Sequence, residues 1–62
     1  MVIEYLIGIS GATLIVYRVG EYFQYEIVFW DGSLYQPQEI YHESGEARDV
    51  GLESIKIVIG YQ

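Results

Sequence analysis

Three glycine-containing dipeptides divide the first half of this 62-residue chain at intervals of about ten residues. They are Ser10-Gly11, Gly20-Glu21 and Asp31-Gly32, and the segments between them are rich in Val, Ile, Tyr and Phe. Such residues favour strands, and glycine-containing pairs favour the tight turns that join antiparallel strands. The sequence therefore predicts an antiparallel meander with strands at residues 2–9, 12–19, 22–30 and 33–36.

The turn at Asp31-Gly32 carries the strongest hairpin signal, because Asp-Gly suits a two-residue type I′ turn in which both central residues have φ > 0. Two-residue turns at all three places determine which residues pair across the strands. The predicted pairs that close the turns are Ile9 with Ala12, Val19 with Tyr22, and Trp30 with Ser33.

This register sorts the strand residues onto two faces of the sheet. The predicted inner face is almost wholly apolar, which supports the register, and collects Ile3, Tyr5, Ile7, Ile9, Ala12, Leu14, Val16, Phe23, Tyr25, Ile27, Phe29 and Leu34, with Arg18 and Gln36 at its ends. The predicted outer face holds Val2, Glu4, Leu6, Gly8, Thr13, Ile15, Tyr17, Val19, Tyr22, Gln24, Glu26, Val28, Trp30 and Tyr35.

The last third of the chain is typical of an amphipathic helix that follows a loop at residues 37–43. Ser44 suits an N-cap and Gly60 a C-cap. The apolar stripe recurs at helical spacing as Ala47, Val50, Gly51, Ser54, Ile55 and Val58. Its small central residues predict a close approach to the sheet. Residues 55–59 are rich in β-branched side chains, so a fifth strand there is the alternative. The predicted fold is a single α+β domain, residues 1–62, with the element order ββββα.

Composition excludes several classes of function. Nine acidic residues against three basic ones leave a net charge of −6, which disfavours direct binding to nucleic acid. The longest uncharged run, residues 5–17, is too short for a membrane span, which needs about 20 residues. Residues 1–4 lack the basic start of a secretory signal. With no cysteine, the chain suits a reducing compartment, and we expect it in the cytoplasm.

The residues that could support catalysis are few. His42 is the single histidine, and Glu39 and Glu43 beside it would supply too few ligands for a metal site from one copy of the chain. The serines lie at predicted turns, at the helix cap and on the helix face, where each has a structural role. We therefore expect no enzyme activity, no cofactor and no metal.

The predicted outer face differs from an ordinary solvated sheet face, which alternates to charged and hydroxyl side chains. It is apolar and aromatic, and such surface on a small protein usually marks an interaction site. The candidate protein-binding residues are Tyr17, Tyr22, Val28, Trp30, Tyr35, Leu6 and Ile15. The alternative is that these side chains only stabilise cross-strand pairing. The chief hypothesis is a non-enzymatic interaction module that binds a protein partner, a second copy of itself, or both.

A second hypothesis concerns the acidic side chains of the helix region. Glu43, Glu46, Asp49 and Glu53 could present a negative strip to a basic groove on another protein, as an acidic inhibitor or nucleic-acid mimic would. The alternative for this strip is a solvated helix face that serves solubility.

The pattern Glu43-Ser44-Gly45-Glu46-Ala47, followed by Leu52 and Ile55 after a meander, resembles the small HicB-like antitoxin domains over about residues 22–59. The Pro-Gly segment typical of that family before its helix is absent from this chain. The resemblance implies a protein-binding, non-catalytic role.

Overall fold

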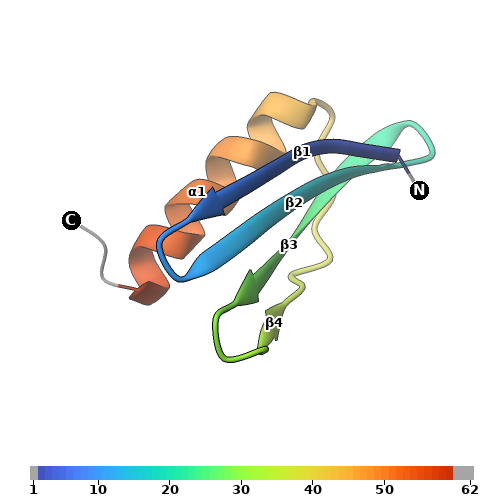
Figure 1. Cartoon of the computed structure of the whole chain (residues 1–62). Coiled ribbons are helices and arrows are strands. Elements are labelled where there is room, and N and C mark those ends of the chain that lie inside the picture. The colour runs from blue at the N-terminus through green and yellow to red at the C-terminus, as the bar shows by residue number, and fades with distance from the viewer. Residues whose placement is uncertain (1, 60–62) are drawn as a thin grey trace.

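A computed structural model describes residues 2–59 as one antiparallel sheet covered on one face by a helix (Figure 1). The elements are β1 (Val2–Ile9), β2 (Ala12–Val19), β3 (Tyr22–Phe29), β4 (Leu34–Tyr35) and α1 (Ser44–Ile59). The strands lie in the order β1-β2-β3-β4. The predicted ββββα fold is therefore confirmed, and residues 55–59 belong to the helix and not to a fifth strand. Within the described chain, α1 is not long and apolar enough to cross a membrane.

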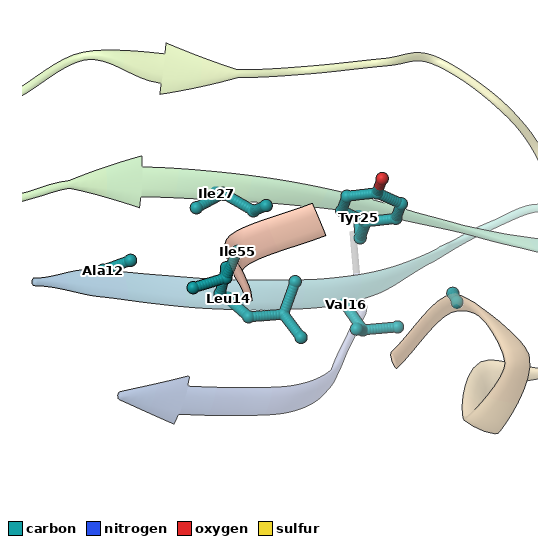
Figure 2. Close-up of a cluster of buried hydrophobic side chains, with 7 residues drawn as sticks. Ala12, Leu14, Val16, Tyr25, Ile27 and Ile55 are labelled. Atoms are coloured by element: carbon teal, nitrogen blue, oxygen red, sulfur yellow. The ribbon is translucent and has the colours of Figure 1, made fainter. Parts of the chain in front are cut away.

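The hydrophobic core lies between α1 and the two central strands. Figure 2 shows side chains of β2 and β3 directed at the underside of the helix. The buried residues are Ala12, Leu14, Val16, Tyr25, Ile27, Ala47, Gly51 and Ile55. The helical members are four residues apart, so they form one narrow stripe along α1.

Gly51 allows the helix to approach the sheet closely. A Cβ atom at this position would lie 2.5 Å from Leu14 Cδ1 and 3.2 Å from Tyr25 Cδ1. One turn further, the Tyr25 hydroxyl donates to Ser54 Oγ at 3.0 Å, because Ser54 Oγ itself donates to the carbonyl of Val50. The predicted close approach through small helical residues is confirmed.

The register between β1 and β2 departs from the prediction at one place. Ile9 pairs with Ala12 as expected, but Glu4 is an extra residue that forms a β-bulge, so Ile3 pairs with Tyr17. The predicted inner position of Ile3 is wrong, because one inserted residue moves every residue before it to the opposite face. Val2 now pairs with Arg18. The Glu4 carboxylate, predicted on the outer face, reaches the Arg18 guanidinium at 3.5 Å.

The turn between β3 and β4 is also longer than predicted. The Phe29 amide donates to the Ser33 carbonyl, and the Gly32 amide donates to the Phe29 carbonyl, which encloses a loop of residues 30–32. Gly32 has φ of +88°, whereas Asp31 does not have positive φ, so the turn is not type I′. This is the arrangement of a three-residue hairpin loop with glycine in the left-handed region.

The longer loop reverses the faces of β4. Leu34 pairs with Val28, and Tyr35 pairs with the buried Ile27. The predictions that Leu34 and Gln36 face inward and Tyr35 outward are therefore wrong. Tyr35 lies on the helix side, with its ring centroid 6.3 Å from that of Tyr25.

The segment before the helix is a loop, as predicted, and it is held against β3. Tyr41 and Phe23 exchange two backbone hydrogen bonds of 2.8 Å. The carbonyl of Glu43 accepts the first helical hydrogen bond, from the Ala47 amide, so Glu43 and not Ser44 is the N-cap residue. Val58, predicted within the apolar stripe, is exposed. The predicted C-cap at Gly60 lies outside the described residues.

Candidate protein-binding surface

The face of the sheet opposite α1 is the candidate site, and we call it the outer face. Cross-strand pairing sets Leu6 beside Ile15 and Val28 beside Leu34. The outer face comprises Ile3, Leu6, Gly8, Thr13, Ile15, Tyr17, Val19, Tyr22, Gln24, Glu26, Val28, Leu34 and Gln36. Its apolar members at the two sides of the sheet are the most exposed, with Leu6 at 66% and Leu34 at 57%.

A polar strip crosses the β3 side of the outer face. Gln36 Nε2 donates to Glu26 Oε1 at 2.7 Å, and the Tyr17 hydroxyl lies 3.4 Å from both Gln24 Oε1 and Glu26 Oε1. These side chains partner one another, so the carboxylate is held within the sheet surface. The predicted site residue Tyr17 therefore lies on the outer face with its hydroxyl turned toward polar neighbours.

Two further predicted site residues lie at the margins of the outer face. Tyr22 meets the ring of His42 edge-on, with centroids 5.3 Å apart, so the loop covers part of it. Trp30 is 84% exposed and lies at the turn end of the sheet. Its Cδ1 and the Cδ1 of Ile59 both lie within 4 Å of the position that a Cβ on Gly11 would occupy. The structure thus gathers Leu6, Ile15, Tyr17 and Val28 on one face, sets Tyr22 and Trp30 at its ends, and removes Tyr35.

Sequence reasoning missed two apolar members of the outer face, Ile3 and Leu34. Leu34 could have been found, because Trp-Asp-Gly is equally compatible with a three-residue loop whose last residue is a left-handed glycine. No sequence signal marks the bulge at Glu4. The ion pair with Arg18 that accompanies it joins residues 14 positions apart.

The acidic residues form a second candidate surface at the start of the helix. A shallow hollow of about 460 Å³ is lined by His42, Glu43, Glu46, Asp49 and Val50. Three of the four residues of the predicted acidic strip therefore meet around one depression. Glu53, one helical turn beyond Asp49, is exposed and does not line it.

His42 is exposed on the loop before α1, within the described residues 2–59. In that range no group of three or more His, Asp or Glu side chains is placed to hold a metal ion. The neighbouring carboxylate of Glu39 instead accepts a 2.8 Å hydrogen bond from the Tyr41 hydroxyl. The His42 ring contacts the ring of Tyr22 at the end of the sheet.

Three tyrosines make the fold sensitive to alkaline pH. Burial raises the pKa of Tyr17, Tyr25 and Tyr41, and the carboxylates of Glu26 and Glu39 add to the rise in pKa at Tyr17 and Tyr41 respectively. The folded protein then holds these protons to higher pH than the unfolded chain does. Stability is therefore full below pH 10 and falls as pH rises above it.

We expect the urea midpoint to drop steadily from about pH 10 upward. Tyr41→Phe should flatten this dependence, since it removes the tyrosine that is hydrogen-bonded to Glu39. Urea unfolding at a series of pH values, alongside absorbance of tyrosinate, measures both effects. An unchanged alkaline slope in Tyr41→Phe would contradict the assignment for that residue.

The chain was compared with protein-family models, with curated proteins and with solved structures, and none of the three comparisons gives a match. The resemblance to HicB-like antitoxin domains thus gains no support from them.

Proposed function

We propose that this protein is a small, non-enzymatic interaction module of the cytoplasm that binds a protein partner through its outer face. The observation that carries the proposal is the apolar surface that the helix leaves uncovered. Leu6, Ile15, Val28 and Leu34 lie on adjoining strands of that face, while α1 packs on the opposite side. Apolar surface of this kind gains free energy when a partner removes it from water.

The shape and chemistry of the outer face fit a protein partner. The sheet surface has a central half-buried pair, Ile15 and Val28, and a polar strip at Gln24 and Glu26 that can form hydrogen bonds. An apolar centre with polar groups beside it is the usual anatomy of a protein interface.

A second candidate function is favoured by the acidic hollow. Glu43, Glu46 and Asp49 converge beside His42, so a basic side chain of another protein would meet several carboxylates at once. An acidic inhibitor that occupies a basic groove would use this surface and not the outer face.

One experiment separates the two candidates: quantitative co-purification of partners with the wild type and two double variants. Ile15→Thr with Val28→Thr keeps β-branched side chains in the strands while making the outer face polar. Glu46→Lys with Asp49→Lys reverses charge at the hollow. If the outer face binds, the first variant should retain about tenfold less partner, and retention by the wild type should change little with salt.

The acidic surface is the binding site if partner recovery falls for the charge-reversed variant and falls for the wild type in high salt. Equal recovery with both variants would contradict both candidates. Circular dichroism of each variant confirms that the fold is intact before recovery is compared.

A further inference from the structure

The two edges of the sheet differ in whether they are protected against pairing with a further strand. On one side, β3 is followed by β4, which has only two residues, and by Pro37, and Tyr41 pairs with Phe23 further along. Short edge strands and proline are the usual means by which proteins block further strand pairing. On the other side lies β1, eight residues long, and no described residue pairs with its far side (Figure 1).

The open edge of β1 has none of the usual protection over most of its length. Residues 5–9 contain no charge and no proline, and the bulge and the carboxylate are confined to Glu4. Apolar side chains are incompletely covered on both sides of the strand. Leu6 is 66% exposed on the outer face, and Tyr5, Ile7 and Ile9 are only partly buried on the helix side, because α1 packs mainly on β2 and β3.

We propose that β1 pairs antiparallel with β1 of a second copy of this chain, to form a continuous eight-stranded sheet across a dimer. A strand at this edge satisfies the unpaired backbone N–H and C=O groups and covers apolar side chains on both faces at once. A partner that packs on the outer face would cover the apolar side chains on only one face of β1. The inference therefore goes beyond the proposed function, which concerns the outer face.

Each chain carries a net charge of −6, but this charge does not prevent β1 from pairing with β1 of a second copy. The one charged residue of β1, Glu4, is paired with Arg18 at 3.5 Å. The acidic hollow is formed by the loop before α1 and by the helix itself, and the helix residue that donates a hydrogen bond to β1, at the Tyr5 hydroxyl, is the cation Arg48. Repulsion between charges separated by more than about 8 Å is largely screened at physiological salt.

The geometry also limits the assembly to two copies. Within residues 2–59 each chain offers one open edge, and an antiparallel pair uses the open edges of both copies, so the symmetry closes. A pair of single edge strands is a small interface, and interfaces that bury less than about 1,200 Å² in total are typical of weak association. We therefore expect a weak dimer, with a dissociation constant on the order of 10–100 μM.

The test compares two lysine variants by sedimentation equilibrium from about 1 μM to about 1 mM, concentrations that extend about tenfold beyond that range on either side. Leu6→Lys places a charge at the open edge, and Leu34→Lys places the same charge at the covered edge of the same face, on a residue of similar exposure. The proposal expects a dimer for the wild type and for Leu34→Lys, and at least tenfold weaker association for Leu6→Lys.

Single cysteines supply an independent measurement, because the chain has none of its own. Pairing centred on the uncharged residues 5–9 sets Ile7 opposite Ile7 of the second copy, so Ile7→Cys should form a disulfide between copies on mild oxidation, and Leu34→Cys should not. A monomeric wild type at 1 mM, equal effects of the two lysine variants, or crosslinking at Leu34 alone would overturn the proposal. None of these results would bear on partner recovery through Ile15 and Val28, so failure of this proposal is distinguishable from failure of the proposed function.

Discussion

Replacing Leu14 by alanine is expected to lower the free energy of unfolding by about 2–5 kcal/mol, the range for a leucine removed from a closely packed interior. Leu14 is fully buried on the central strand β2, between Ile27 of β3 and the helix (Figure 2). The neighbours Ile7 of β1, Ile27 of β3 and Gly51 of α1 belong to three different elements, so they cannot all collapse into the space that the side chain leaves. In a domain of this size the loss is a large fraction of the total stability.

Leu34→Ala is the matched control, because it makes the same chemical change on the same sheet at a side chain that is 57% exposed. We expect it to change the free energy of unfolding by no more than about 0.5 kcal/mol. Urea unfolding at one fixed protein concentration measures both variants. Similar losses for the two would mean that Leu14 is not enclosed as described.

Gly51→Ala is expected to destabilise the protein by about 1–2 kcal/mol, although alanine is the better helix former. The new methyl would lie 2.5 Å from Leu14 Cδ1 and 3.2 Å from Tyr25 Cδ1. Both neighbours are buried, so neither can move aside without disturbing the core. Overpacking therefore outweighs the helix propensity gain of about 1 kcal/mol.

Gly45→Ala provides the contrast within the same helix. A Cβ there meets only the Arg48 guanidinium, at 3.7 Å, so we expect a gain in stability of up to about 1 kcal/mol. A sharper check adds Gly51→Ala to Leu14→Ala, where the new methyl enters the vacated space. The sign of its effect should reverse and become stabilising. If Gly51→Ala were stabilising in the wild-type background as well, the close helix–sheet contact would be wrong.

The spacing of apolar residues along the chain predicted most of the fold, because strand and helix backbones each fix how often a side chain returns to the same face. The alternation of apolar residues through β2 and β3 has a period of two, and both turns around β2 have two residues, so every pair from Ala12–Phe29 to Val19–Tyr22 follows from counting. The core residues Leu14, Val16 and Ile27 were predictable for that reason. The helix was predictable because the core-facing residues Ala47, Gly51 and Ile55 recur every four positions.

The predicted strand faces were wrong wherever one extra residue was inserted into a strand or a turn. The bulge at Glu4 and the third loop residue before Ser33 each moved a neighbouring segment to the opposite face. The candidate site inherited both errors, since it gained Ile3 and Leu34 and lost Tyr35. Asp-Gly is compatible with loops of two or three residues. The choice between them depends on how β4 fits beside β3 and not on the dipeptide alone.

By itself, the sequence determined where the three hairpin connections lie, the apolar inner face of the central strands and the helix that covers it, because these follow from local backbone preferences and hydrophobic periodicity. Only the tertiary structure decided which apolar side chains remain outside. The helix is narrower than the sheet and lies over β2 and β3, so β1 is left as an open edge and the outer face is uncovered. That outcome depends on the width and position of packed elements, which no local pattern in the chain encodes.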